Sequence, residues 1–440
     1  MNRRNSVFSQ LDITVIALGL FLIFFGWINI YAAGYKPEYS SIFSFSQEYG
    51  KQFIWICTGV FLFLVICLLD SSIFTKLSYL YYGAAMALLV AVLIFGKEVN
   101  GAKSWFGVGS VGFQPSEFAK IACALLLSKH LSDHPKKSSK NLLMALGIIA
   151  LPCILIMLQP DTGTVLVFTA FILILYRFQY VGNIILAGIL AILLAVVALI
   201  IQSSNFTIPF TSQPLEGKYF LVLLIAAIGG IALLMVPRLV IVKKLRKKIN
   251  TSIIATVLVS GVFVLGVNYA VNEILSPHQT SRVNILLGLE DDPQGAGYNV
   301  KQSKTSIGSG GFAGKGFLNG TLTKFKYVPM QSTDFIFCTV GEEWGFLGTS
   351  IVVIAFAALI IRLFFLADRQ RSQFSKAYIY AIACIFFMHL LINVGMTIGL
   401  APVIGIPLPF FSYGGSSLVA FILMLAIALR LDAERLNVLR

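Results

Sequence analysis

Three consecutive acids, Glu290, Asp291 and Asp292, stand in a chain that is otherwise dominated by long apolar runs. Asp292 precedes Pro293, and a residue before proline is disfavoured in helices, so Asp292 is expected to be extended. Beside an apolar surface a carboxylate is desolvated and its pKa rises, which suits a general base that accepts a proton near neutral pH. The alternative interpretation is an Asp-Pro turn with solvated acidic neighbours.

The acids are followed by the glycine-rich run GSGGFAGKG at 308–316. Gly308, Gly310 and Ala313 fit the G-x-G-x-x-A spacing of dinucleotide-binding folds, but no strand precedes them, and the run lacks the spacing of a P-loop. A nucleotide site is therefore not predicted. The glycines either permit tight turns and close backbone approach to a bulky ligand, or they form a flexible loop.

Two charged residues fall within a predicted membrane helix. Glu117 and Lys120 are three residues apart, so they share one helix face and are expected to form an intramembrane ion pair or to line a cavity. Charges at such depth are rare, which favours a functional role, with purely structural pairing as the alternative.

Three further residues stand at the ends of predicted elements. Asp161 and Asp334 precede helices, where an N-cap is the simplest role for an aspartate. Trp105 is either an interfacial anchor at the membrane boundary or an aromatic platform for a sugar.

Membrane helices must position these residues. The chain has 440 residues, of which 58% are hydrophobic and 12% are charged, and its mean hydropathy is +0.87. This composition excludes an ordinary soluble core, and an apolar run of about 18 residues is enough to cross roughly 30 Å of hydrocarbon as a helix. The sequence therefore predicts an all-α polytopic membrane protein. Twelve spans are expected near 12–33, 52–69, 77–96, 116–131, 142–158, 162–180, 183–202, 218–236, 251–274, 345–366, 377–400 and 413–430.

Positive charges in short loops mark the cytoplasmic side of a membrane protein. With twelve spans crossing the membrane in turn, both chain ends and the basic loops, including the cluster at 238–250, fall on the cytoplasmic side. The positive charge of this cluster is explained by its role in topology and by contact with lipid, so binding of nucleic acid is not needed to explain it. The long segment 275–344 then faces outward. So do the Pro- and Gly-rich breaks at 107–117, 158–163 and 403–417, which predicts an outward-facing cavity in a single membrane domain over 1–440.

The cations of the outer segment have two interpretations, which are attraction of an anionic partner and simple solvation of a loop. The six cysteines lie mostly within predicted helices and are expected to be packing residues. The four histidines are dispersed along the chain. Neither a disulfide framework nor a metal-binding quartet is therefore predicted.

Five segments together carry a family resemblance: NGAKSWFGVGSVGFQPSEFAKIA, LQPDTGTVLVF, DPQGAGYNVKQSKTSIGSGGFAGKGFLNGT, STDFIFCTVGEEWGFLG and PLPFFSYGGSSL. With these segments in this order, the chain resembles the SEDS family (shape, elongation, division and sporulation), and its elongation members more than its division members. The resemblance implies a helical bundle with a large extracytoplasmic loop. The family usually has ten membrane crossings, so two are expected to be additional here, near 203–250.

The resemblance implies a peptidoglycan glycosyltransferase that polymerises lipid II into β-1,4 glycan strands at the outer face of the bacterial cytoplasmic (inner) membrane. It implies a partner as well, a class B penicillin-binding protein that cross-links the glycan. The aspartate that opens the D-P-x-G-A-G-Y motif is the essential acid of the family, and here it is Asp292. As the general base it would deprotonate the acceptor 4-hydroxyl while undecaprenyl pyrophosphate leaves.

The departing pyrophosphate needs neutralisation by cations. By charge and place, Arg282, Lys301 and Lys304 are expected to supply it, with Lys103 and Lys120 lining the cavity. The other substrate-binding positions, which match the family's motifs, are Trp105, Glu117, Gln302, Ser303, Ser309, Gly310, Ser412, Gly414 and Gly415. A divalent cation such as Mg²⁺ would suit a pyrophosphate substrate, although no dedicated ligand set is visible in the sequence, and no other cofactor is expected.

The segment VPMQSTDFIF lacks the acid and the histidine that commonly precede T-D-F-I-F in the family, so no role is carried over for those two positions. Two other functions remain as alternatives. A lipid II flippase would use Glu117 and Lys120 in a translocation path. A non-catalytic scaffold would bind a penicillin-binding protein through its helix faces and would be indifferent to Asp292.

Overall fold

The computed structural model describes residues 10–35, 41–99, 102–108, 111–135, 138–180, 188, 191, 194–195, 197–198, 205–207, 214–239, 243–274, 280, 296–401 and 403–435. The chain divides into two compact units. Unit 1 comprises Met1–Gly182 and Tyr298–Arg440, and unit 2 comprises Asn183–Gly297.

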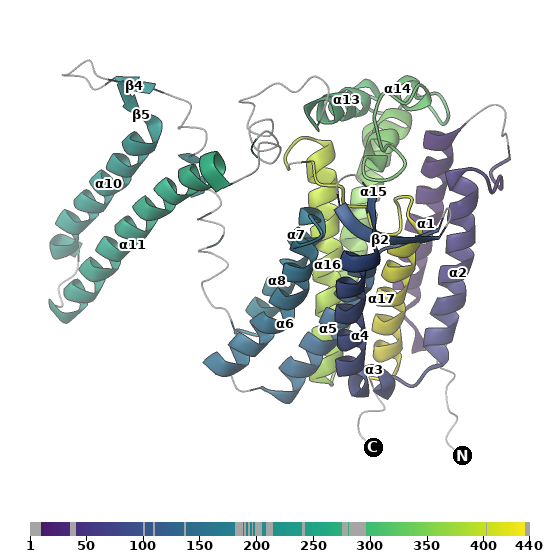
Figure 1. Ribbon diagram of the computed structural model, residues 1–440, viewed down its shortest axis with the longest axis horizontal. Helices are drawn as coiled ribbons and strands as arrows, with labels where there is room; N and C mark the ends of the chain where they lie inside the picture. Colours follow the sequence, from purple (N-terminus) through teal and green to yellow (C-terminus); the bar gives the residue numbers. More distant parts are fainter. Residues whose placement is uncertain are drawn as a thin grey trace. The chain divides into compact units, whose positions relative to one another are not determined.

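Unit 1 is a bundle of helices with a small sheet at one end (Figure 1). Its helices are α1 (Ile13–Gly34), α2 (Glu48–Leu68), α3 (Ser72–Lys76), α4 (Ser78–Phe95), α5 (Pro115–Asp133), α6 (Ser139–Met157), α7 (Thr162–Phe168), α8 (Ala170–Arg177), α13 (Ala296–Ser309), α14 (Thr321–Lys324), α15 (Ile336–Asp368), α16 (Gln373–Thr397) and α17 (Gly415–Ala433). Its strands are β1 (Lys97–Val99), β2 (Ala102–Val108) and β3 (Val111–Phe113).

Unit 2 contains two long apolar helices that pack along each other, α10 (Gly217–Leu239) and α11 (Lys243–Tyr269). A π-helix, η2 (Ala270–Ile274), continues α11. A two-stranded antiparallel hairpin, formed by β4 (Asn205–Thr207) and β5 (Pro214–Glu216), precedes α10.

The prediction of a polytopic helical membrane protein is confirmed. Within the described residues, nine helices are long and apolar enough to cross a membrane: α1, α2, α4, α6, α10, α11, α15, α16 and α17. Two more of the predicted spans form helices that do not meet both conditions, namely α5 and the pair α7 and α8. Most of the predicted span at 183–202 lies outside the described residues.

The centre of unit 1 is formed by α16 and α17. In the most apolar 18 residues of each helix, 94% of the residues of α17 and 67% of those of α16 are buried. In α2 only 17% are buried. Helix α16 packs against α5, α8, α15 and α17. The central helices are therefore shielded by protein, while α2 presents most of its surface to the surrounding hydrocarbon.

The strands form a three-stranded antiparallel sheet in the order β1-β2-β3. Pro115 then occupies the first turn of α5, where its missing N–H has no helical partner to lose. Figure 1 shows this sheet with α13 and α14 at one end of the bundle, and α3 at the other. We call these the sheet end and the α3 end.

Helix α15 is interrupted at Gly345, whose φ of 63° and ψ of −157° are not helical. The preceding loop bridges the interruption. The backbone N–H groups of Phe346 and Leu347 donate to the carbonyls of Gly311 and Phe312 at 2.9 and 3.1 Å. The glycine-rich run is therefore an ordered segment docked on α15, so of the two alternatives given for its glycines, the flexible loop is wrong.

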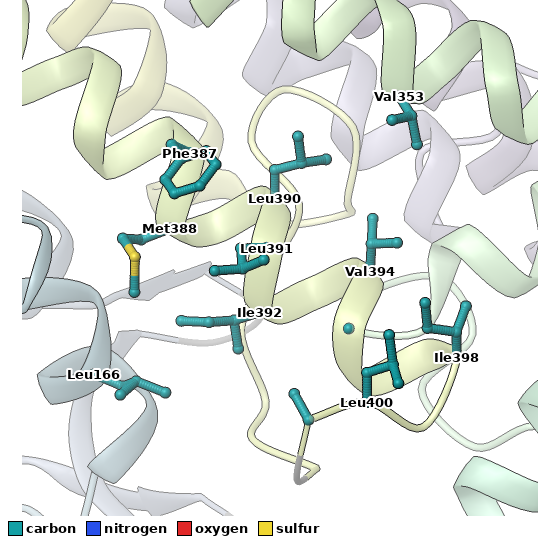
Figure 2. Close-up of a pocket in the computed structure, with 12 residues that line it drawn as sticks. Leu166, Val353, Phe387, Met388, Leu390, Leu391, Ile392, Val394, Ile398 and Leu400 are labelled. Carbon is teal, nitrogen blue, oxygen red and sulfur yellow. The ribbon is translucent and has the colours of Figure 1, made fainter. Parts of the chain in front are cut away.

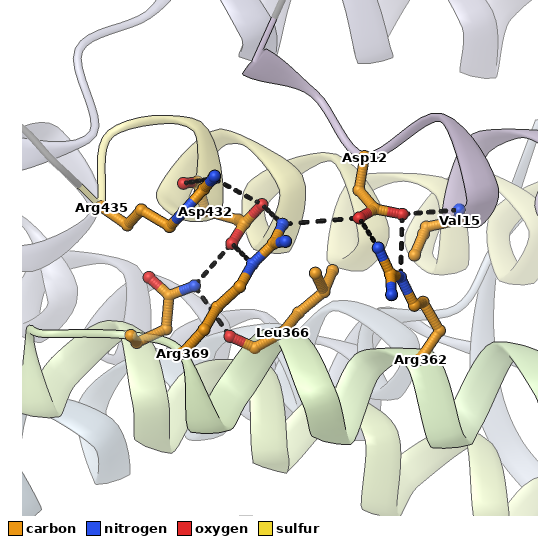
Figure 3. Close-up of polar contacts among 8 residues, drawn as sticks. Asp12, Val15, Arg362, Leu366, Arg369, Asp432 and Arg435 are labelled. Atoms are coloured by element: carbon orange, nitrogen blue, oxygen red, sulfur yellow. Dashed lines mark hydrogen bonds and ion pairs between the residues drawn. The ribbon is translucent and has the colours of Figure 1, made fainter.

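The α3 end is closed by a network of ion pairs (Figure 3). Asp12, which caps α1, accepts from Arg362 at 2.7 Å and from Arg369 at 3.4 Å. Arg369 also pairs with the fully buried Asp432, which accepts from Gln370 at 2.7 Å as well. The network joins the start of α1 to the ends of α15 and α17, so these three helices are held together at this end.

Candidate functional site

A buried ion pair lies within unit 1, near the start of α5. The Lys120 ammonium on α5 is 2.9 Å from Glu117 Oε2, and both side chains are almost completely buried. Of the two alternatives predicted for Glu117 and Lys120, the ion pair is therefore confirmed. The ammonium also lies 2.9 Å from Nε2 of His389 on α16 and 5.3 Å from the centre of the Phe421 ring.

The hydrogen bonds of His389 determine its tautomer. Nδ1 lies 3.0 Å from the carbonyl oxygen of Pro407, which can only accept, so Nδ1 carries the proton. Nε2 is then an acceptor and takes a hydrogen bond from the Lys120 ammonium. A neutral histidine can satisfy a buried lysine without adding a second positive charge, so this arrangement links α5 to α16 at low electrostatic cost.

Helix α13 presents two lysines on one exposed face. Lys301 and Lys304 are three residues apart, and both side chains are exposed. Neither forms an ion pair with a described residue. The opposite face is anchored, because the buried Ser303 donates to the carbonyl of Thr397 at 2.9 Å, while Gln302 beside it is half-buried.

The end of α13 is packed tightly on α15. A Cβ placed on Gly310 would lie 1.9 Å from the carbonyl oxygen of Gly341, so no side chain fits there. The exposed Ser309 donates to the carbonyl of Ser306 at 2.8 Å and closes the last turn of the helix. Gly310 therefore permits close backbone approach, which was one of the alternatives for the glycines. The group that approaches is the backbone of Gly341 and not a ligand.

Glu342 anchors the segment after α13 and was not among the predicted site residues. Its fully buried carboxylate accepts hydrogen bonds from one ammonium, three hydroxyls and two backbone N–H groups. The donors are Lys315 Nζ (2.6 Å), Thr321 Oγ1 (3.2 Å), Leu322 N (2.9 Å), Thr323 N (2.8 Å), Thr323 Oγ1 (2.7 Å) and Ser306 Oγ (3.4 Å). A carboxylate with this many donors remains ionised and holds the segment rigidly.

The motif before α17 is held by α2. The Gln52 amide donates to the carbonyl of Ser412 at 3.4 Å and accepts from the backbone N–H of Gly414 at 3.2 Å. Ser412 Oγ accepts from the N–H of Leu408 at 2.9 Å. A Cβ on Gly415 would lie 2.2 Å from the indole of Trp55, so this glycine is required by packing.

Two predicted residues lie on β2. Lys103 Nζ donates to the carbonyl of Ile94 at 3.0 Å, near the end of α4, where a positive charge is favourable. The half-buried Trp105 packs against Gly112 of the neighbouring β3, because a Cβ at Gly112 would lie 2.9 Å from the indole ring. Lys103 therefore helps to attach the sheet to α4, whereas Trp105 packs within the sheet.

Two aspartates from different elements meet near the sheet end. Asp161 caps α7 as predicted, since it accepts from Thr164 N at 3.0 Å. The N-cap role predicted for Asp334 is wrong, because Phe335 occupies the N-cap of α15. Burial, and then the nearby charge of Asp161, raise the pKa of Asp334 to about 6. Its carboxylate therefore titrates close to neutral pH.

Asp292 and Arg282 lie outside the described residues, as do Glu290 and Asp291. The cations that the structure does describe are distributed over three elements: Lys103 on β2, Lys120 in the bundle interior, and Lys301 and Lys304 on α13. Of these, only the α13 pair is exposed and free of an acceptor among the described residues. Lys120 and Glu117 are brought together, but both are buried, whereas the α13 lysines are exposed.

The chain is similar to known proteins over nearly its full length. The family model FtsW/RodA/SpoVE, described as "Cell cycle protein", matches residues 12–214 and 218–437. The segment at 203–250 that was expected to be additional is thus aligned with the family, apart from residues 215–217.

Named relatives match equally completely. The chain is 33% identical to "Peptidoglycan glycosyltransferase RodA" of Treponema pallidum, covering 97% of this chain and 99% of the relative. It is 29% identical to "Peptidoglycan glycosyltransferase MrdB" of Escherichia coli, covering 97% and 94%. "Stage V sporulation protein E" of Bacillus subtilis is 28% identical over 96% of this chain and 97% of that relative.

Solved structures have the same fold. One, described as "Structural coordination of polymerization and crosslinking by a peptidoglycan synthase complex", aligns with a TM-score of 0.68 at 24% identity, over 97% of this chain and 98% of that chain. The rod shape determining protein RodA of Thermus thermophilus aligns with a TM-score of 0.59 at 21% identity, over 97% of both chains. Together with the family match, this means that the chain belongs to the FtsW/RodA/SpoVE family, the SEDS family that its motifs predicted.

Proposed function

We propose that this membrane protein is a peptidoglycan glycosyltransferase that polymerises lipid II during cell elongation. The observation that carries the proposal is the 33% identity to a protein named peptidoglycan glycosyltransferase RodA. The match covers 97% of this chain and 99% of the relative, so the activity is inferred from a match over the full length and not over a fragment.

The proposed reaction is a single displacement. Asp292 takes the proton from the 4-hydroxyl of the acceptor sugar as its oxygen attacks the anomeric carbon of the donor. The bond between that carbon and the pyrophosphate oxygen breaks, and undecaprenyl pyrophosphate departs with the electron pair. Attack from the opposite side inverts the anomeric carbon and gives a β-1,4 linkage. The motif that Asp292 opens supports this role.

The pyrophosphate would be neutralised mainly by the α13 lysines. Lys301 and Lys304 are exposed on one face and hold no acceptor among the described residues, and we assign Arg282 to the same role by its charge. Lys103 and Lys120 already donate to protein acceptors. We therefore assign these two to holding β2 on α4 and α5 on α16.

A metal ion is given no step in this mechanism. Within the described residues, no three His, Cys, Asp or Glu side chains come together as a possible metal site. A divalent cation such as Mg²⁺ would be held by the pyrophosphate with one or two carboxylates, and Glu290, Asp291 and Asp292 are the acids nearest in sequence to the α13 lysines.

We further propose that the sheet end faces outward from the bacterial cytoplasmic membrane and that both termini are cytoplasmic, as the basic loops predict. The partner would be a class B penicillin-binding protein. The structurally similar complex that combines polymerization with crosslinking supports this choice.

The test is to incubate the purified protein and its partner with lipid II in liposomes and to resolve the products on a gel. Glycan chains are expected when the transpeptidase of the partner is inactivated. Movement of lipid II across the bilayer without any glycan would favour the flippase alternative. Glycan formation that is unaffected by the loss of Asp292 would favour the scaffold.

A further inference from the structure

An apolar groove of about 500 Å³ lies on the surface of unit 1. Figure 2 shows the side chains around it, which come from α7, α15 and α16 and the residues just after α16. The lining consists of Leu166, Val353, Phe387, Met388, Leu390, Leu391, Ile392, Val394, Gly395, Ile398, Leu400 and Ala401. No residue in it carries a polar side chain, so only a hydrocarbon ligand would be favoured there.

Within unit 1, the groove is open at the surface. Leu391 is 53% exposed and Leu400 is 78% exposed, although both are large and apolar. Along α16 the lining runs from Phe387 to Gly395 at about 1.5 Å per residue, which gives roughly 12 Å of helix toward the sheet end. A groove of this length on a membrane-spanning face can take an extended hydrocarbon chain from the bilayer.

A positive charge lies at the end of the groove that is nearest the sheet. Gly399, with a φ of 78°, turns the chain between the lining residues Ile398 and Leu400. A Cβ placed on Gly399 would lie 3.2 Å from Cδ and 3.2 Å from Nζ of Lys304. The ammonium of Lys304 thus sits directly beside the last lining residues, and Lys301 is one helical turn away on the same face of α13.

Specific contacts hold α13 over the end of the groove that is nearest the sheet. Ser303 donates to the carbonyl of Thr397 at 2.9 Å, and Val300 Cγ1 would lie 3.2 Å from a Cβ on Gly399. These contacts hold α13 across the end of α16. An apolar groove that ends at two cations matches an amphiphile with a long apolar chain and a multiply charged anionic head.

We infer that this groove holds the polyisoprenyl chain of a lipid-linked pyrophosphate, with the pyrophosphate at Lys304 and Lys301. The inference rests on the proposed function and places the lipid part of that substrate. A pyrophosphate has two adjacent anionic groups for the two lysines, whereas the phosphodiester of a common phospholipid has one. The pair of cations therefore favours the pyrophosphate lipid as the occupant.

To test this inference, a lining residue of the groove is replaced by tryptophan, whose larger side chain would fill the groove. Leu391→Trp and Val394→Trp are compared with Ile361→Trp, a matched control on α15 that is 52% exposed and does not line the groove. For full-length lipid II, each groove variant is expected to raise KM about tenfold or more, the equivalent of roughly 1.4 kcal/mol of chain contact, with kcat nearly unchanged. With a lipid II analogue that carries a single isoprene unit, which is too short to extend along the groove, groove variants and control should behave alike.

A binding measurement separates this inference from the proposed function. Undecaprenyl pyrophosphate without sugar is titrated against the full-length protein in nanodiscs by native mass spectrometry. Weaker binding by Leu391→Trp and by Lys304→Gln, but not by Ile361→Trp, supports the groove even if no glycan is made, in which case only the proposed function fails.

Three results would overturn the inference. In the first, the groove variants match the control with full-length lipid II. In the second, the penalty is equal for short and long chains and is relieved by excess partner, so that the groove is occupied by a helix of the partner. In the third, anionic phospholipid displaces undecaprenyl pyrophosphate at equal concentration, so that the groove is a general lipid site.

Discussion

The Nζ atom of Lys120 lies 2.9 Å from Nε2 of His389, although the two residues are 269 positions apart in the chain. The same ammonium is 2.9 Å from Glu117. This buried group joins α5, which follows the sheet, to α16, which carries the apolar groove. Loss of the Lys120 ammonium should therefore lower the stability of unit 1.

Lys120→Met is expected to destabilise the protein by about 3–5 kcal/mol, because it leaves the Glu117 carboxylate buried without its partner. The double variant Glu117→Gln with Lys120→Met removes both charges and should recover much of that loss. Thermal unfolding in detergent measures the difference. A single variant as stable as the wild type would contradict the buried pairing.

His389→Gln and His389→Leu test the role of the histidine as an acceptor. A glutamine can accept from Lys120 and donate to the carbonyl of Pro407, whereas a leucine can do neither. We expect the leucine variant to lose roughly 1–3 kcal/mol more stability than the glutamine variant in the same unfolding assay. Equal stability of the two variants would mean that the hydrogen bonds of His389 contribute nothing.

Gly310→Ala is expected to displace the end of α13 and to lower polymerisation strongly, because the added methyl group would overlap the carbonyl oxygen of Gly341. Gly308→Ala is the matched control, since nothing lies within 4 Å of a Cβ at that position. Initial rates of glycan formation measure the effect. Equal rates for the two variants would show that the contact between α13 and α15 does not matter for the reaction.

Glu342→Gln is expected to loosen the segment from Lys315 to Thr323, because the amide cannot accept from all the donors that the carboxylate satisfies. Trypsin provides a local measurement, since Lys315, Lys324 and Lys326 flank this segment. We expect cleavage there about tenfold faster than in the wild type, equivalent to roughly 1.4 kcal/mol of local stability.

Lys315→Met is the control for this prediction. It removes one donor and leaves the other hydrogen bonds to Glu342 in place, so Lys324 and Lys326 should be cleaved only slightly faster than in the wild type. If Glu342→Gln were cleaved no faster than Lys315→Met, the carboxylate would not be the anchor of the segment.

The pKa of Asp334 gives stability a dependence on pH. Burial and Asp161 raise this pKa from 3.8 to about 6, so the folded protein binds the proton more tightly than the unfolded chain does. The contribution is fully present below about pH 4 and is lost as the pH rises to about 6. After allowance for partial exposure, we expect a fall of about 1 kcal/mol across this range, which Asp334→Asn should abolish. If Asp334→Asn showed the same difference in stability between pH 4.5 and pH 7 as the wild type, Asp334 would not be the source of the pH dependence.

The helical membrane class and most spans could be predicted from the sequence, because long apolar runs need no tertiary context. The pairing of Glu117 with Lys120 was predictable for a related reason, since helical spacing alone brings positions three apart together. The N-cap at Asp161 follows from local chain geometry in the same way.

The partners that come from distant parts of the chain could not be predicted. His389 gave no local signal, because its role depends on α5 and α16 packing side by side. Glu342 and its neighbour Glu343 stand within an apolar helix, where acids are rare, and this was a usable signal for a buried site. The donors to Glu342 are contributed by a segment that only folding brings back onto α15.

The proposed reaction depends most on Asp292 as the base that activates the acceptor sugar. The most direct measurement is the rate of lipid II polymerisation by the purified protein with its partner, for the wild type, Asp292→Ala and the adjacent Asp291→Ala, each shown to be folded by its unfolding curve. We predict that Asp292→Ala loses at least about 10²-fold in rate, as expected for removal of a general base, while Asp291→Ala stays within a few-fold of the wild type. Undiminished glycan synthesis by folded Asp292→Ala protein would contradict the role of Asp292 as the general base.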